Sequence, residues 1–305
     1  MHKDTIFQVP DLGLDERIHV FRRLFSAPDE FGQLQVDAYV IVTDIFLIVC
    51  DTLLCPEDAQ WMLNQVQDRL AGRELVVINS HADWDHVWGN SYFADSPHKL
   101  LLIGQALCAA RMQATENQTL LKNYQAHFPL FKQVRIVPPL LTFEQSLPID
   151  GGNLKLELLA TPGHSADHCS LWLPELKLLL AFDAAEWPLP TIEGQHSVDA
   201  MRNSLEQLRA LQPLQVLCSH GQTSHPDILD ENLAYLHTIE ERCRNLLATR
   251  QPEESELAHP SQLIAYPYEE IIGQTKQEID HEFYRQTHEQ NILRILEKLA
   301  SEKPA

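Results

Sequence analysis

Hydrophobic runs of strand length, separated by short polar breaks, dominate the first part of the chain. Residues 33–42 and 45–54 are two such runs, parted only by Thr43 and Asp44, and this spacing predicts two adjacent strands of a hairpin. A helix is predicted over residues 57–70, because apolar side chains recur there at intervals of three and four residues. The chain therefore opens with paired strands followed by a helix.

The same order of elements continues toward residue 220. Residues 105–131 predict one or two helices, since Gly and Pro are absent until Pro129, and residues 197–211 predict an amphipathic helix. Further strand-like runs cover residues 74–80, 99–104, 134–139, 154–160, 169–174, 177–183 and 214–220. Two halves of similar order indicate a sandwich of two mixed sheets covered by helices, which is an α+β class.

The C-terminal part of the chain is almost wholly helical in pattern. Residues 228–250 and 278–300 are long helix candidates, and residues 251–270 between them carry the prolines and acidic residues of a loop or short-helix linker. We therefore expect a sandwich domain over residues 1–225 and a helical C-terminal extension, packed on the sandwich, over residues 226–305.

The charge and composition of the chain indicate which kinds of molecule it is expected to bind. The 23 basic and 43 acidic residues give a net charge of −20, which disfavours phosphate backbones and anionic lipid surfaces. We expect a small-molecule substrate and neither nucleic acid nor membrane as a partner, and assembly into a homo-oligomer stays open. The N-terminal residues hold no signal-like apolar segment and the six cysteines form no C-x-x-C pair, which indicates a cytoplasmic protein with reduced thiols.

A dense group of possible metal ligands follows the strand-like residues 74–80. His81, Asp83, Asp85 and His86 occupy four of six consecutive positions in the segment HADWDH. Crowding carboxylates and imidazoles without a cation costs roughly several kcal/mol in repulsion and desolvation, so this density predicts a metal site. The alternative is a solvated loop whose aspartates only cap a helix.

Three further candidates also come directly after predicted strands. His164 lies in the segment TPGHSADH, where Pro162 and Gly163 predict a turn that projects the imidazole from its tip. Asp183 follows an apolar strand, and an acid so close to a core needs a cation or several hydrogen-bond donors. His220 follows another buried strand in the segment SHG.

Taken in order, these segments resemble the ligand motifs of the metallo-β-lactamase superfamily, over roughly residues 17–225. Four motifs in the right sequence are far more specific than one H-x-x-H segment. The resemblance implies a four-layer αββα sandwich with a two-metal site along one edge of the sheets. By position it implies that His81, Asp83 and His164 hold the first metal, that Asp85, His86 and His220 hold the second, and that Asp183 bridges the two. Thr161, Pro162 and Gly163 would shape the turn before His164.

One departure from the family pattern affects the chemistry. The family's first motif is H-x-H-x-D-H, and Asp83 stands where the second histidine is expected. A third carboxylate cancels more of the positive charge of two divalent metals and favours harder cations such as iron or manganese over zinc. The alternative is that Asp83 does not ligate, which leaves one metal at Asp85, His86 and His220. A second departure is Leu53, where the family often has the glycine of a D-T-G segment.

The resemblance also implies the activity. We expect a hydrolase that uses a hydroxide bridging two divalent metal ions, with Asp85 orienting that hydroxide as the catalytic residue, on a small ester, thioester, lactone or related acyl substrate. Zinc is the first expectation for the metals, with iron or manganese as alternatives. Two other functions stay open, namely a carboxylate-rich di-iron redox protein related to flavodiiron proteins and a non-catalytic metal-binding member of the superfamily.

Several neighbouring side chains have supporting roles in this prediction. Asp167 is a candidate for orienting an imidazole, His168 is undecided, and Trp84 is expected to pack beside the ligands. Cys169 and Cys218 are expected to be small buried hydrophobes and not nucleophiles. In the last helix Tyr284, His288 and Asn291 form a polar stripe, which either closes a substrate pocket or pins the helix to the sandwich.

Overall fold

The computed structural model describes residues 5–10, 12–27, 32–95, 100–221, 223–273 and 279–302. The chain divides into two compact units. Unit 1 comprises Met1–Phe25, Gln35–Ala160 and Asp167–Leu180, and unit 2 comprises Ser26–Leu34, Thr161–Ala166 and Ala181–Ala305. Each unit is therefore assembled from separate stretches of sequence. The predicted boundary between residues 225 and 226 stays a prediction.

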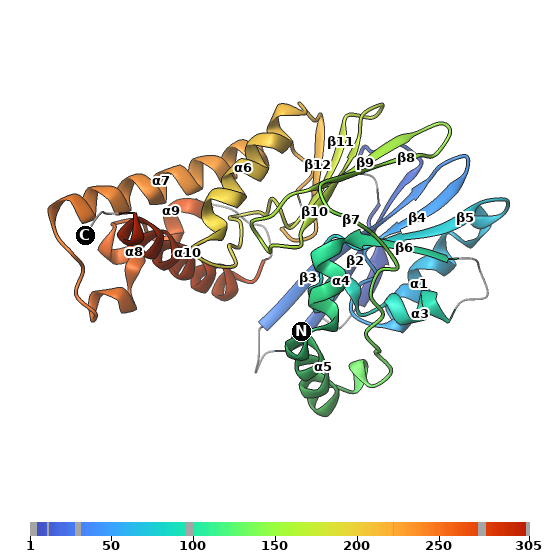
Figure 1. Cartoon of the computed structure of the whole chain (residues 1–305), viewed down its shortest axis with the longest axis horizontal. Helices are drawn as coiled ribbons and strands as arrows, with labels where there is room; N and C mark the ends of the chain where they lie inside the picture. The colour runs from blue at the N-terminus through green and yellow to red at the C-terminus, as the bar shows by residue number, and fades with distance from the viewer. Residues whose placement is uncertain are drawn as a thin grey trace. The chain divides into compact units, whose positions relative to one another are not determined.

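A seven-stranded sheet follows the order of the sequence from β1 to β7 (Figure 1). Its strands are β1 (Thr5–Gln8), β2 (Ile18–Ala27), β3 (Gly32–Val42), β4 (Phe46–Cys50), β5 (Glu74–Ile78), β6 (Leu100–Gln105) and β7 (Leu141–Phe143). The predicted hairpin is confirmed, since β3 and β4 pair antiparallel and the hydroxyl of Thr43 accepts the Phe46 N–H at 2.8 Å in the turn. From β4 to β7 the pairing is parallel, so the carboxyl ends of β4 and β5 lie at the same edge.

The helices of unit 1 are short. They are α1 (Pro56–Gln65), α2 (Trp84–Val87), α3 (Asn90–Ala94), α4 (Ala106–Gln113) and α5 (Thr115–His127), with single 3₁₀ turns η1 (Gln67–Leu70) and η2 (Pro129–Phe131). The prediction of one or two helices over residues 105–131 is confirmed as two, because the chain is extended at Ala114. Trp84 packs as expected, with its ring 5.1 Å from that of Tyr124 and 5.7 Å from that of Phe131.

The strand predicted over residues 134–139 is wrong. This stretch has no regular structure, and the next strand, β7, begins only at Leu141. The segment ends in Pro138 and Pro139, which have no N–H to donate to a neighbouring strand. The carbonyl of Val137 instead accepts a hydrogen bond from the side chain of Asn90 at 2.9 Å.

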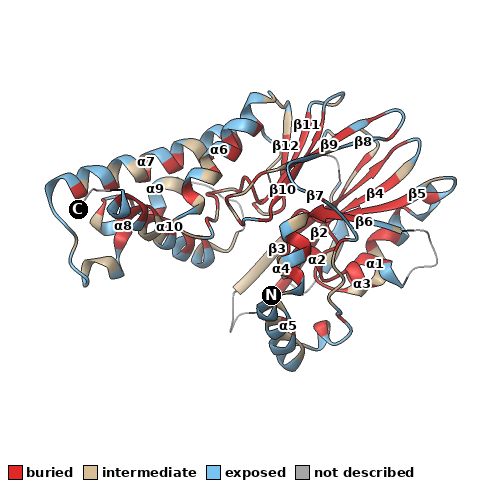
Figure 2. Cartoon of the chain, viewed as in Figure 1, coloured by how far each residue is buried: buried red, intermediate tan, exposed pale blue. Residues whose placement is uncertain are grey.

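A second sheet has five strands in the order β12-β11-β10-β9-β8. They are β8 (Ser146–Asp150), β9 (Lys155–Ala160), β10 (Cys169–Leu173), β11 (Leu178–Phe182) and β12 (Gln215–Cys218). Within unit 1 this sheet approaches the first one where the Cys169 N–H donates to the Ser80 carbonyl at 2.8 Å. Every residue of β10 and β11 is buried, as are most of β4 and β5 (Figure 2). Two sheets with helices confirm the predicted α+β class.

Unit 2 contains the helices of the C-terminal region, of which α6, α7 and α10 are long. They are α6 (Ser197–Ala210), α7 (Ile228–Thr249), α8 (Pro260–Leu263), α9 (Tyr268–Ile272) and α10 (His281–Ser301), with a 3₁₀ turn η3 (Glu256–Ala258). Helices α7 and α10 pack side by side, and α6 packs on α7 (Figure 1). The short helices between α7 and α10 confirm the predicted linker. No helix in the described ranges is both long enough and apolar enough to cross a bilayer.

Candidate metal centre

Four of the predicted ligands lie together in unit 1, just beyond the carboxyl end of β5. His81 and Asp83 are in the turn that follows β5, and Asp85 and His86 are on α2, which begins directly after Asp83. The His81 Nε2 atom is 3.3 Å from an Asp83 oxygen, and the His86 Nε2 atom is 3.6 Å from an Asp85 oxygen. The two imidazole rings are 4.2 Å apart between centroids. Unit 1 thus gathers two imidazoles and two carboxylates in one short segment, the turn after β5 and the start of α2.

Asp51 and Ser80 make hydrogen bonds to the Nδ1 atoms of both imidazoles. Asp51 has an oxygen 2.9 Å from Nδ1 of His86, and because a carboxylate only accepts, the Nδ1 atom carries the proton. The Ser80 hydroxyl donates to Asp51 at 2.7 Å and therefore accepts from Nδ1 of His81 at 2.9 Å. With Nδ1 engaged in this way, Nε2 is the nitrogen through which each imidazole would bind a metal.

Sequence reasoning did not identify this role of Asp51. The residue adopts a φ of 62°, in the left-handed region that Asp and Asn tolerate better than most residues. The φ of Leu53 is 61°, and this is where the family pattern has glycine, so the turn keeps a glycine-like backbone around a fully buried leucine. The position of Asp51 at the carboxyl end of a buried strand was the signal that could have identified it.

A charged network supports the same turn. Arg111 on α4 is 2.6 Å from Asp83 and 3.0 Å from Asp167, and the second oxygen of Asp167 accepts the Ala82 N–H at 2.7 Å. Asp167 was predicted to orient an imidazole, and its hydrogen bonds go instead to this main-chain N–H and to the guanidinium. His168 is buried, with its ring 5.2 Å from that of His81, and its role stays open.

The other three predicted ligands lie together in unit 2. One oxygen of Asp183 is 3.6 Å from Nε2 of His164 and 3.4 Å from Nε2 of His220. A single carboxylate oxygen therefore faces two imidazole nitrogens. The predicted bridging of two metals by Asp183 stays a prediction.

The turn that carries His164 requires glycine. Gly163 has a φ of 152°, and a Cβ at this position would lie 2.4 Å from the Cα of Met201 on α6. The carbonyl of Pro162 accepts the Ser204 hydroxyl at 2.7 Å, which ties the same turn to α6. The predicted shaping of this turn by Pro162 and Gly163 thus has a physical basis in the approach of the helix backbone.

A buried glutamate adjoins the unit 2 ligands. Glu186 follows Asp183 by three residues and accepts hydrogen bonds from the Tyr284 hydroxyl at 2.7 Å and the Thr191 hydroxyl at 3.1 Å. Burial raises the pKa of Glu186, and the nearby Asp183 raises it further while His220 opposes the shift. Asn232 of α7 clamps the main chain of Glu186 with two hydrogen bonds of 2.9 Å. Sequence reasoning named none of these contacts.

The polar stripe on α10 pins that helix within unit 2. Beyond the Tyr284 contact, Asn291 donates to the Pro190 carbonyl at 2.7 Å and accepts the Ile192 N–H at 3.3 Å. His288 lies 2.7 Å from the Tyr266 carbonyl and 2.9 Å from the Tyr235 hydroxyl. Of the two interpretations of this stripe, the pinning role is the one these contacts support.

The ligand distances within each unit fit a metal better than direct hydrogen bonding. The four imidazole-to-carboxylate pairs span 3.3 to 3.6 Å, beyond the usual hydrogen-bond distance of about 2.7–3.2 Å. Two donors bound to one tetrahedral zinc at about 2.0–2.1 Å lie about 3.3 Å from each other. Nitrogen and oxygen donors at this separation could therefore hold a divalent transition ion.

The cysteines do not contribute to this chemistry. All six are free and buried. Burial raises the pKa of Cys169 and of Cys50 well above the ordinary value, so both stay thiols at neutral pH. This agrees with the expectation that Cys169 and Cys218 pack as small apolar side chains.

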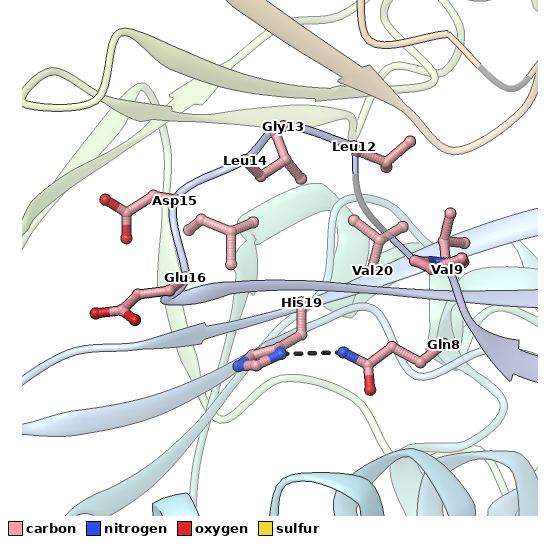
Figure 3. Close-up of a pocket in the computed structure, with 11 residues that line it drawn as sticks. Gln8, Val9, Leu12, Gly13, Leu14, Asp15, Glu16, His19 and Val20 are labelled. Carbon is pink, nitrogen blue, oxygen red and sulfur yellow. Dashed lines mark hydrogen bonds between the residues drawn. The ribbon is translucent and has the colours of Figure 1, made fainter.

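A separate pocket of 430 Å³ lies beside β1 and β2 in unit 1 (Figure 3). Apolar side chains such as Val9, Leu12 and Val20 line it, and Gln8 and His19 form a hydrogen bond of 3.2 Å at its edge. It contains none of the predicted ligands. We assign it no part in the chemistry.

Comparisons with known sequences agree with the family resemblance. The family model described as "Metallo-beta-lactamase superfamily" matches residues 31–220 of this chain. A stretch of 74 residues is 40% identical to the beta-lactamase-like protein 2 homolog of Caenorhabditis elegans. That stretch covers 24% of this chain and 23% of the relative, so the chain matches less than a quarter of the relative's length.

Solved structures agree with the fold. A metallo-beta-lactamase family protein from Thermus thermophilus matches with a TM-score of 0.62 and 17% identity, over 93% of each chain. A metallo-beta-lactamase from Pontibacter korlensis matches with a TM-score of 0.59 and 16% identity, over 76% of this chain and 99% of that one. At such identities the likeness shows the fold, and it confirms the predicted sandwich architecture.

Proposed function

The chain belongs to the metallo-beta-lactamase superfamily, and from this membership we propose that it is a metal-dependent hydrolase of a small acyl substrate. The substrate class comprises esters, thioesters, lactones and related acyl compounds. Family membership alone does not choose the reaction, because one fold supports many activities. The proposal therefore depends on the ligand chemistry of the two units.

The observation that carries the proposal is the set of hydrogen bonds that orients the imidazoles of His81 and His86 in unit 1. Asp51 and Ser80 hydrogen-bond to Nδ1 of His86 and His81, and the Nε2 atom of each imidazole lies next to a carboxylate oxygen. A histidine that binds a metal through one ring nitrogen usually donates its other N–H to a carboxylate or another acceptor, as His86 and His81 do here. In unit 2 the oxygen of Asp183 that faces His164 and His220 supports the same conclusion.

We assign the ligands as the motif order implies. His81, Asp83 and His164 would hold the first metal, Asp85, His86 and His220 the second, and Asp183 would bridge them. Bound divalent ions supply a strongly acidified water and polarise the carbonyl under attack. The protein's own part is to turn the imidazole Nε2 atoms toward the metals, to place the Asp85 carboxylate as a hydrogen-bond acceptor for the attacking water, and to hold both clusters in place.

The net charge supports a small substrate over a nucleic acid. A surface with 43 acidic and 23 basic residues repels polyanions, so phosphodiesters of nucleic acids are disfavoured as substrates. We propose zinc as the first candidate metal, because imidazole and carboxylate suit it, and iron or manganese as alternatives favoured by the extra carboxylate of Asp83.

The test is elemental analysis of protein purified without added metal, together with a panel of ester, thioester, lactone and phosphodiester substrates. We expect a bound transition metal and turnover of an acyl substrate, both lost in His86→Ala. The matched control is His225→Ala, since this histidine is 70% exposed at its side chain and outside both clusters. Two irons with reductant-dependent spectra, oxygen uptake and no hydrolysis would replace the proposal with the redox function. Absence of any transition metal would overturn both.

A further inference from the structure

Arg111 contacts the turn that carries the unit 1 ligands directly at Asp83 and, through Asp167, at the neighbouring residue Ala82. One guanidinium nitrogen, Nη2, is 2.6 Å from Oδ1 of Asp83, and the other, Nη1, is 3.0 Å from Oδ1 of Asp167. Asp167 in turn accepts the Ala82 N–H through Oδ2 at 2.7 Å. The guanidinium is therefore held on one side by a buried carboxylate, and its other side is fixed against Asp83.

The two oxygens of Asp83 face different groups. Oδ1 faces the guanidinium, and Oδ2 lies 3.3 Å from Nε2 of His81. We propose that Arg111 is a positioning residue for the metal ligand Asp83. Arg111 holds one oxygen of the Asp83 carboxylate, so that Asp83 binds the metal through its other oxygen. This inference rests on the proposed function, because it requires Asp83 to be a ligand.

The difference between histidine and aspartate as ligands explains why such a residue is needed. An imidazole offers a metal one nitrogen in a fixed direction, whereas a carboxylate can bind through either oxygen or both. Pairing one oxygen with a guanidinium leaves a single donor, so Asp83 takes the place of the histidine that the family motif has at this position. The positive charge of Arg111 also offsets the additional negative charge that Asp83 brings.

The anchoring by Asp167 distinguishes this contact from an ordinary surface ion pair. The side chain of Asp167 is 1% exposed and binds the main chain between His81 and Asp83. Movement of the guanidinium would therefore disturb a buried hydrogen bond as well as an ion pair, which is costly in a low-dielectric setting. Arg111 is thus fixed relative to the turn whose carboxylate it orients.

The test measures zinc affinity by competition with a chromophoric chelator, in the full-length protein and without reference to turnover. Arg111→Gln is compared with the unmodified protein and with the same change in an Asp83→His background. We expect Arg111→Gln alone to weaken zinc binding about 10-fold to 100-fold, as is typical for groups that orient a ligand. In the Asp83→His background we expect no further loss, because the imidazole has no second oxygen to be held.

A matched control and a folding measurement keep the result interpretable. Arg22→Gln removes a two-pronged ion pair with Asp37 elsewhere in unit 1 and should leave zinc affinity unchanged. Circular dichroism of the metal-free variants reports whether they fold. Unchanged or stronger zinc binding in folded Arg111→Gln overturns the inference, as does an equal loss in both backgrounds. If the unmodified protein binds no transition metal, the proposed function itself has failed.

Discussion

The carboxylate of Asp51 accepts a hydrogen bond from Nδ1 of His86 at 2.9 Å, and it also binds both the main-chain N–H and the hydroxyl of Ser80. Asp51 is no predicted ligand, yet it fixes the tautomer of one ligand directly and of a second through Ser80. Changing Asp51 should therefore weaken metal binding without removing a donor atom.

Asp51→Asn should weaken zinc binding about 10-fold to 100-fold. The amide oxygen can still accept the Ser80 N–H, but the amide nitrogen then donates to Nδ1 of His86, which moves the proton to Nε2 and blocks coordination. Asn tolerates the φ of 62° at this position, so the backbone is retained. Isothermal titration or chelator competition measures the effect. Unaltered affinity would contradict the assigned tautomer, and Asp37→Asn serves as the carboxylate control.

Tyr284→Phe should lower the free energy of unfolding by about 1–3 kcal/mol, because the buried Glu186 carboxylate loses a donor that water cannot replace. The comparison is Tyr268→Phe, whose hydroxyl contacts His281 at 3.1 Å in a less buried setting. Urea denaturation of both variants gives the two values. Equal losses would mean that the Glu186 contact is no more important than an ordinary tyrosine hydrogen bond.

Gly163→Ala should destabilise the protein more than Gly72→Ala. Both glycines have a positive φ, of 152° and 79°, so each alanine introduces backbone strain of about 1–3 kcal/mol. Only at Gly163 does the new Cβ meet the backbone of Met201, and we expect this overlap to add about 1–3 kcal/mol. Thermal and urea unfolding of the two variants test the difference. Similar losses would show that α6 can move away at little cost.

Protein stability should fall as the pH is lowered from about 6.5. Burial lowers the pKa of His288 in the folded state, although Glu289 and Glu269 oppose this shift. The unfolded chain therefore takes up this proton first, and folding loses free energy as the pH falls from the unfolded pKa toward the lower folded one. His288→Gln should reduce the slope of unfolding free energy against pH between about 7 and 5. An unchanged slope would assign the dependence to other groups, His19 among them.

Much of the fold was predictable because its elements have strong periodicity or follow clear breaks. The helix over residues 197–211 is α6, and the hairpin around Thr43 and Asp44 is present as expected. The first strands, β1 and β2, were not predicted, since the alternation in residues 18–27 is interrupted by two adjacent arginines. For residues 134–139 the error was the reverse, since a strand was predicted where none forms. The apolar side chains of this stretch are typical of a strand, but its two prolines cannot donate hydrogen bonds to a neighbouring strand.

The candidate ligands were predictable because metal chemistry restricts the residue types and the strand ends restrict their positions. Their supporting residues were not. Arg111 lies in the last turn of α4, and it gains its role only because folding brings this helix to the turn at Asp83. Tyr284 and Glu186 are 98 positions apart, and nothing in either local sequence specifies the other as a partner. The local sequence therefore identifies the side chains that can bind a metal. It does not identify the distant side chains that hold them in place, because those contacts depend on tertiary packing.

The segment after Asp183 is held by side chains from two helices near the end of the chain, with Asn232 on α7 and Tyr284 and Asn291 on α10. A fragment ending at residue 225 would keep every motif that suggests a metal enzyme and would lose all three of these supports. A homologous protein with different C-terminal helices would need other side chains to make these hydrogen bonds to the segment after Asp183. We therefore expect helices α7 and α10 and the segment that follows β11 to be retained together among related proteins.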